Sequence, residues 1–288
     1  MIPYRREGIN MKIQVLVATM YQDEGVHSLL DRINLQSDAV VVNQCDRDKK
    51  YCFKYNGYDV LWIDSTDRGL SNSRNLALSN ANAEICVICD DDEILTTGYP
   101  VMIDDAYMAI PEADVIAFNI ERIGWSEAER LFVKPQKIGW FKTYSSVHIT
   151  FRRTKVQEKH IVFDTRFGAG SKMYSSSEDA IFCMDCHKSK LKMYTSPGVL
   201  CSVNCENSTW FNGYNEKYFF DVGAYLSATF PRLKNVLKWY YPLRCGKLSE
   251  LSWQKIICAI NEGVRGYKKQ YNYAQYQIYK ASAKSQRT

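Results

Sequence analysis

Short apolar runs alternate with helix-like stretches through the first 120 residues of this 288-residue chain. The runs are rich in β-branched residues, as buried strands are, and the stretches between them carry apolar residues at helical spacing. Such alternation predicts a mainly parallel sheet with right-handed crossovers. The predicted strands are 12–19, 39–43, 60–63, 84–89 and 114–119, and the predicted helices are 26–35, 70–81 and 99–109.

The pattern changes after about Glu121. Residues 147–151 alternate like a half-buried strand, and 163–177 are rich in Gly and Ser, as loops are. A helix is predicted to begin near Ser177, which can cap it, with acidic residues in its first turn. Two short strands, 191–194 and 198–200, are predicted to follow. The chain is long enough for one large α/β domain with an appendage.

Charge is distributed unevenly along the chain. Residues 232–288 hold twelve Lys or Arg against Glu250 and Glu262, a net charge of +10, and this segment is also rich in Trp and Tyr. Basic residues interleaved with Trp and Tyr suit an anionic membrane interface. They would also suit nucleic acid, and a helical hairpin packed on the core is the plain structural alternative.

Export and membrane-spanning signals are lacking in the sequence. No apolar run reaches the roughly 18–20 residues of a membrane span, and residues 1–10 have no signal-peptide core, so we expect a leader, either disordered or upstream of the true start. The ten cysteines are therefore expected to be reduced cytoplasmic thiols. A zinc site from Cys86, Cys89, Cys183 and Cys186 is a weaker alternative, since a strand and a helix are poor settings for zinc knuckles.

The most informative polar feature is the run of acids from Asp90 to Glu93, directly after a buried strand. Adjacent carboxylates repel one another unless a cation joins them. A hard divalent cation such as Mg²⁺ prefers oxygen ligands, and open α/β sheets place ligands at the carboxyl ends of strands. An isolated run of this kind is also compatible with a solvated acidic turn.

Two further polar clusters are predicted at the same edge of the sheet. One joins Thr19 to Tyr21 with Asn43 and Asp46, and the other is the helix entry 68–75. The chain has no Gly-x-Gly-x-x-Gly and no Walker loop, so a glycine cradle for phosphates is not expected. A diphosphate could instead be neutralised by a metal on the acids together with Arg74.

Four motifs, in this order, resemble those of family 2 glycosyltransferases of the GT-A fold. They are Ala18-Thr19-Met20-Tyr21, Arg68-Gly69-Leu70-Ser71-Asn72-Ser73-Arg74-Asn75, Asp90-Asp91-Asp92 and Glu178-Asp179. The resemblance covers roughly residues 11–205, and 208–215 is similar to bacterial capsular-polysaccharide members. It implies a Rossmann-like, mixed and mainly parallel sheet with flanking helices in a catalytic domain, 11–230. Residues 11–119 would bind the nucleotide sugar and 120–230 the acceptor, and 231–288 would form a basic, aromatic, mostly helical extension.

The resemblance also implies roles for single residues. The nucleotide sugar would be bound by Thr19, Tyr21, Asn43, Arg68, Arg74, Asp90 and Asp91. Asp92, with Asp90, would ligate Mn²⁺ or Mg²⁺. Asp179 would be the general base with Glu178 beside it, and Trp210 and Phe211 would form a wall for the acceptor sugar.

The sequence departs from the family pattern in two places. Asn43 and Asp46 stand where relatives commonly carry an acidic pair after the second strand, which leaves the base specificity open. No His follows His187 to serve as a late metal ligand, and Asn204 or Cys205 occupies that neighbourhood. The metal site is therefore expected to depend more on phosphates and water.

The implied function is inverting, metal-dependent transfer of a sugar from a UDP-sugar to a hydroxyl of a lipid-linked or growing polysaccharide. This would serve capsule, exopolysaccharide or other cell-surface glycan synthesis at the inner face of the cell membrane. One alternative is an inactive nucleotide- or sugar-binding scaffold of a polysaccharide assembly complex. Another, a sugar nucleotidyltransferase, requires a Gly-rich loop that 18–22 lacks. Structural roles remain open for Arg74, for Glu178 with Asp179, for Trp210 with Phe211, and for His148.

Overall fold

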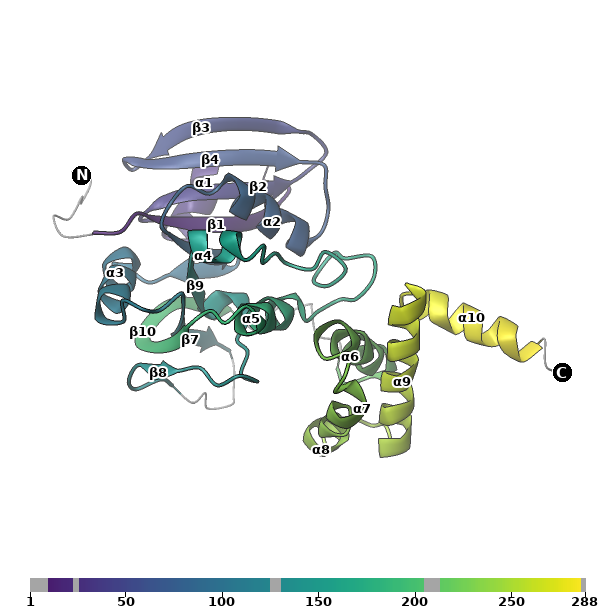
Figure 1. Cartoon of the computed structure of the whole chain (residues 1–288). Helices are drawn as coiled ribbons and strands as arrows, with labels where there is room; N and C mark the ends of the chain where they lie inside the picture. The colour runs from purple at the N-terminus through teal and green to yellow at the C-terminus, as the bar shows by residue number, and fades with distance from the viewer. Residues whose placement is uncertain (1–9, 23–25, 125–130, 205–212, 286–288) are drawn as a thin grey trace. The chain divides into compact units, whose positions relative to one another are not determined.

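The computed structural model describes residues 10–22, 26–124, 131–204 and 213–285 (Figure 1). The chain divides into two compact units. The first unit comprises residues 1–163 and 182–208, and the second comprises 164–181 and 209–288. The predicted leader, apart from its last residue, lies outside the described residues.

The first unit is built on one mixed sheet with the strand order β3-β4-β2-β1-β5-β9-β7-β10-β6, and β8 pairs with β10. Neighbouring strands are parallel from β4 through β2 and β1 to β5, whereas β9 is antiparallel to both of its neighbours. The predicted mixed, mainly parallel sheet is thus confirmed. The strands are β1 (Ile13–Met20), β2 (Asp38–Gln44), β3 (Lys49–Tyr55), β4 (Tyr58–Ser65), β5 (Ile85–Asp90), β6 (Glu93–Leu95), β7 (Val115–Ile123), β8 (Gln136–Lys137), β9 (Ile149–Arg152) and β10 (Met193–Asn204).

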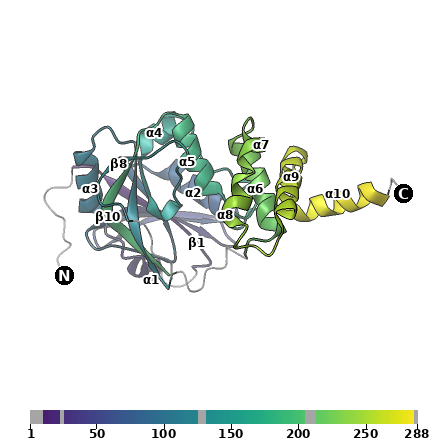
Figure 2. The same ribbon diagram turned by 90° about the horizontal axis from the view of Figure 1, so that it is seen from below.

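Helices cover both faces of this sheet because its central strands are apolar on both sides. α1 (Val26–Arg32) and α3 (Tyr99–Ala109) pack on one face. α2 (Leu70–Asn80), α4 (Arg153–Glu158) and the part of α5 (Glu178–Lys188) from Phe182 onward pack on the other. Figure 2 shows α4 and α5 on one side of the sheet and α1 on the other.

Several elements differ from those predicted. The strand β3 is absent from the prediction, yet it forms a hairpin with β4 through Asn56 and Gly57, whose φ angles are 48° and 88°. An Asn-Gly pair is the usual signal for such a turn. The two short late strands are one strand, β10, whose pairing with β7 shifts register between Ser196 and Val199. A short 3₁₀ helix, η1 (Ser146–His148), occupies the start of the predicted strand 147–151.

The second unit is helical and contains α6 (Glu216–Thr229), α7 (Lys234–Leu237), α8 (Tyr240–Cys245), α9 (Trp253–Lys269) and α10 (Tyr273–Ser285). Figure 1 shows α6 and α9 side by side. Their contact is close because glycines line it: a Cβ on Gly263 would lie 1.9 Å from the Phe220 carbonyl oxygen. The helical nature of the C-terminal region is confirmed, and α6 belongs to the same compact unit as these helices.

The segment 164–181 also belongs to the second unit. Phe167 and Tyr174 pack with Phe220 of α6 and Tyr276 of α10. The Ser175 hydroxyl donates a 2.8 Å hydrogen bond to the Asp221 carboxylate. Among the described residues, no helix is long and apolar enough to cross a membrane.

Candidate functional site

The carboxyl ends of four parallel strands bring the predicted polar residues to one edge of the sheet. Strand pairing sets Ala18 of β1 opposite Asp90 of β5, and Thr19 opposite Asn43 of β2. Asn43 is in turn opposite Asp64 of β4. The edge predicted from the sequence therefore exists, and strand register alone aligns its residues.

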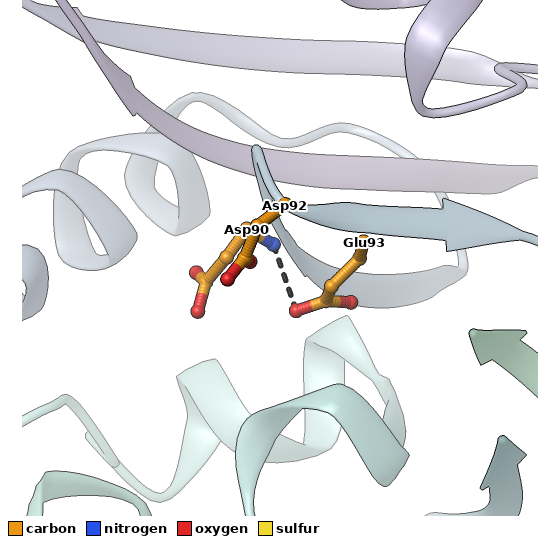
Figure 3. A group of neighbouring side chains, drawn as sticks. All are labelled: Asp90, Asp92 and Glu93. Carbon is orange, nitrogen blue, oxygen red and sulfur yellow. Dashed lines mark hydrogen bonds between the residues drawn. The ribbon is translucent and has the colours of Figure 1, made fainter. Parts of the chain in front are cut away.

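The acids from Asp90 to Glu93 form the turn between β5 and β6. Carboxylate oxygens of Asp90, Asp92 and Glu93 lie within 4.8 Å of one another, and Figure 3 shows the three carboxylates on the same side of the turn. Asp92 is exposed, whereas Glu93 is buried and accepts a 2.9 Å hydrogen bond from the Asp90 backbone N–H. The four acids are thus not equivalent, and the buried Glu93 stabilises the turn through its hydrogen bond to the Asp90 backbone.

Two residues from other elements, Thr19 of β1 and Arg32 of α1, form hydrogen bonds to Asp91 of the same turn. The Thr19 hydroxyl donates to an Asp91 carboxylate oxygen at 2.5 Å. The Arg32 Nε donates to the Asp91 carbonyl at 3.2 Å. Thr19 is itself buried, so it orients Asp91 and has little surface of its own for a nucleoside.

The electrostatics of the turn favour a cation. The Asp92 side chain reaches solvent, but the protein around its carboxylate partly desolvates it, and this desolvation, followed by the charge of the neighbouring Asp91 carboxylate, raises the pKa of Asp92. Burial, and then the charge of Asp90, raise the pKa of Glu93 well above its usual range. A divalent cation with oxygen ligands would relieve this repulsion, so the donor set fits Mg²⁺ or Mn²⁺. The ligands would be Asp92 and Asp90, as the resemblance implies, and Glu93 lies beside them.

Arg74 of α2 orients the Asp90 carboxylate through hydrogen bonds. Its side chain is 2% exposed. The Nη2 group donates to both Asp90 carboxylate oxygens, at 3.1 and 2.9 Å, and to the Ser146 hydroxyl at 2.7 Å. The guanidinium also lies over the Phe163 ring, 5.3 Å from its centre. The buried Arg74 is therefore placed to position Asp90.

Tyr21 and Arg68 form an exposed surface at the end of β1. Tyr21 is 54% exposed, and the Arg68 guanidinium lies 5.6 Å from the centre of its ring. Arg68 also donates to the carbonyls of Cys45 and Thr66, at 2.9 and 2.8 Å, and to the Asp46 carboxylate at 2.5 Å. An aromatic ring and a guanidinium held by two loops offer flat faces on which a nucleobase could stack.

Asn43, for which the resemblance implies a role in nucleotide binding, is held by other groups of the protein. It is completely buried. Its Oδ1 accepts from the Gln22 N–H at 3.0 Å, and its Nδ2 donates to Asp64 at 2.8 Å. Its amide therefore joins β2, β4 and the loop after β1. In this structure the Asn43 side chain therefore presents no exposed surface to a base.

Asp64 is a supporting residue that the sequence reasoning missed. Burial alone would raise the pKa of Asp64, but hydrogen bonds from Arg47, Asn43 and Trp62 outweigh it and lower that pKa. The Arg47 Nε lies 2.6 Å from the Asp64 carboxylate. Nothing in the local sequence distinguishes Asp64 from an ordinary strand-end acid, because only Trp62 lies on the same strand, whereas Asn43 comes from β2 and Arg47 from the loop after β2.

Glu178 and Asp179 begin α5 and are counted with the second unit. Glu178 is buried against Gly168, where a Cβ would lie 3.0 Å from the Glu178 Cδ. Gly168 has a φ of 106°, a conformation that favours glycine. Asp179 is half-buried. Of the two carboxylates, Asp179 is thus the more accessible one.

Other predicted residues are placed differently or not described. Trp210, Phe211 and Cys205 lie outside the described residues, and Asn204 ends β10. The only group of His, Cys, Asp or Glu close enough to hold a metal, within the described ranges, is Asp90, Asp92 and Glu93. The cysteine zinc site is therefore not supported. His148 Nδ1 lies 2.7 Å from the Phe118 carbonyl, which is a structural contact.

Comparisons with known proteins agree with this fold. The crystal structure of S. aureus TarS residues 1–349 with UDP is similar at a TM-score of 0.59 and 13% identity, over 91% of this chain and 93% of that one. The complex of the same protein with UDP-GlcNAc gives 0.57 and 14%, over 91% and 93%. No curated protein matches by sequence.

A sequence profile described as Glycosyl transferase family 2 matches residues 22–178, more than half of the chain. Enzymes of this family with the GT-A fold generally use a nucleotide sugar and a divalent cation. This chain belongs to glycosyl transferase family 2 and is a glycosyltransferase of the GT-A fold.

Proposed function

We propose that this enzyme transfers a sugar from a UDP-sugar to a hydroxyl group, with inversion at the anomeric carbon. The observation that carries the proposal is the acid turn, where Asp90 and Asp92 share an oxygen-rich site at the carboxyl end of β5. Binding of UDP and UDP-GlcNAc by the similar TarS structures supports UDP as the nucleotide.

The donor would bind along the edge formed by β1, β2, β4 and β5. Tyr21 and Arg68 would receive the base, and Asp90, oriented by Arg74, would approach the ribose. Asp92, with Asp90, would hold Mn²⁺ or Mg²⁺, and such a cation would offset the charge of the departing diphosphate when it is bound.

In the proposed reaction, the oxygen of an acceptor hydroxyl forms a bond to the anomeric carbon. The bond from that carbon to the diphosphate oxygen breaks, and its electron pair leaves with UDP. The hydroxyl proton passes to the Asp179 carboxylate, and Glu178 helps to orient that group. A carboxylate is a weak base, but it need only accept the proton late, as the new bond forms. One displacement from the opposite face inverts the configuration.

The acceptor is proposed to be a lipid-linked or growing polysaccharide of the capsule, exopolysaccharide or another cell-surface glycan. The resemblance of 208–215 to capsular-polysaccharide enzymes supports this class of acceptor. A lipid-linked acceptor would require the enzyme at the inner face of the cell membrane, and the basic, aromatic residues of 231–288 suit such a surface.

A UDP-release assay with a panel of UDP-sugars and Mn²⁺ tests the donor chemistry, and calorimetry measures UDP binding. We expect Asp92→Asn to weaken metal-dependent UDP binding by about tenfold or more. Asp105→Asn, which changes an exposed acid on α3, is the matched control and should leave binding unchanged. No UDP binding with any divalent metal would contradict the proposal. Binding of UDP without turnover of any sugar would favour the scaffold alternative.

A further inference from the structure

Exposed apolar side chains are concentrated in one short stretch of the second unit. Seven of the large apolar residues that the structure describes as exposed lie between residues 233 and 253. They are Leu233, Val236, Trp239, Tyr240, Leu243, Leu248 and Trp253. Single exposed apolar residues need no explanation, but a cluster of exposed apolar residues indicates an interaction surface. We call residues 233–255 the apolar-basic surface.

These side chains are displayed by a packed scaffold. Pro242 and Cys245 of α8 are buried, and Lys238 Nζ donates to Asn261 of α9 at 3.0 Å. A Cβ on Gly246 would lie 2.3 Å from the Pro242 carbonyl oxygen and 2.8 Å from the Trp253 indole nitrogen, so the end of α8 lies directly against Trp253. The exposed residues therefore lie on helices that are packed against the rest of the second unit.

Trp239 and Trp253 also share one depression of the surface. It has a volume of about 490 Å³, and its lining includes Ile257, Cys258 and Asn261 of α9. The two indoles thus belong to the same face of the second unit, although 14 positions separate them in the sequence. The Lys238 ammonium lies 5.9 Å from the Trp239 ring centre, so a cation accompanies the aromatic residues there.

The charge of the apolar-basic surface is almost entirely of one sign. The segment contains Lys234, Lys238, Arg244, Lys247 and Lys255, and its acidic residue is Glu250. Arg244 lies over the Tyr240 ring, 5.8 Å from its centre. Trp and Tyr favour the level of lipid headgroups, and nearby Lys and Arg are attracted to anionic lipids. A second copy of the same surface would bring cations against cations, which disfavours self-association.

We propose that the apolar-basic surface binds the interface of an anionic lipid bilayer. Val236, Leu243, Leu248 and the two indoles would enter the boundary between headgroups and acyl chains, as interfacial helices do. The cations would remain at the level of the lipid phosphates. Five of the twelve Lys and Arg of residues 232–288 lie on this surface. This binding rests on the proposed membrane location and does not depend on the chemistry of transfer.

Vesicle sedimentation with the full-length protein tests this binding. The probes are vesicles of phosphatidylglycerol with phosphatidylcholine, and vesicles of phosphatidylcholine alone. The triple variant Val236→Ser, Leu243→Ser, Leu248→Ser changes side chains that are 70%, 69% and 63% exposed, so the fold should persist. We expect its partition to anionic vesicles to fall about tenfold or more. Lys247→Gln with Lys255→Gln should reduce it about fivefold for each charge.

A matched control separates this surface from exposed apolar residues in general. Ile278→Ser on α10 and Met108→Ser on α3 also change exposed residues, 68% and 56% exposed, and should bind vesicles like the unchanged protein. UDP release with a water-soluble acceptor should be the same in all of these variants, so a failure of transfer is distinguished from a failure of membrane binding. Unchanged partition of the triple variant would overturn the proposal. Equal binding to both vesicle types, or a dimer in analytical ultracentrifugation that the triple variant abolishes, would overturn it too.

Discussion

At the scale of single residues, the candidate site depends on a buried ion pair. Arg74 and Asp90 contact each other with side chains 2% and 25% exposed, and removing one partner of a buried pair is strongly destabilising. We expect Arg74→Met to lower the free energy of unfolding by about 3 kcal/mol in urea denaturation.

An exposed pair provides the control for this prediction. Lys54 and Asp59 lie 2.6 Å apart with side chains 65% and 67% exposed. Pairs of this kind contribute less than about 1 kcal/mol, so Lys54→Met should have little effect. Equal effects of the two substitutions would mean that Arg74 does not act through a buried charge.

His187 gives the first unit a pH dependence outside the acid turn. Burial lowers the pKa of His187, and this effect exceeds that of the hydrogen bond to the Lys142 carbonyl. The unfolded chain therefore takes up a proton first, near its usual pKa of about 6.5. Stability is full above that pH and falls as the pH drops toward the lower folded pKa. Thermal unfolding between about pH 8 and 5 should show a shallower decline in His187→Gln, and parallel curves would refute the assignment.

At the scale of elements, close packing of α6 on α9 holds the second unit together. Gly263→Ala would place a methyl group 1.9 Å from the Phe220 carbonyl oxygen and 2.7 Å from its carbonyl carbon, both backbone atoms. Alanine favours helices by about 1 kcal/mol over glycine, but overpacking commonly costs about 1–3 kcal/mol and should dominate here. Chemical denaturation should therefore show a less stable protein. Gly139→Ala, where a Cβ meets nothing within 4 Å, should be nearly neutral, and a stabilised Gly263→Ala would show that the helices can separate cheaply.

The elements differ in how well the sequence predicts them. The central strands are continuous apolar runs because both faces are covered, so their type and order are predictable. The edge strand β3 carries Lys49, Lys50 and Lys54, which suits an edge and obscures the apolar pattern. The acid turn is predictable because four adjacent carboxylates are unusual. The burial of Asn43 and Arg74 is not, because it depends on which strands and helices meet there.

At the scale of the whole molecule, the residues proposed for the donor and for the acceptor belong to different compact units. Asp90 and Asp92 belong to the first unit. Asp179 lies in the segment 164–181, which belongs to the second unit. If the two units carry separate halves of the reaction, substitutions in them should fail in different ways.

We therefore expect Asp179→Asn to bind UDP and Mn²⁺ like the unchanged enzyme, because it alters neither the acid turn nor Tyr21 and Arg68. Its turnover should fall by about a hundredfold or more, since general-base catalysis commonly contributes that much. Asp92→Asn should lose binding and turnover together. Calorimetry with UDP and single-turnover UDP release measure the two quantities separately. Normal turnover of Asp179→Asn would remove Asp179 from the base role, whereas loss of UDP binding in that variant would contradict a role confined to proton transfer.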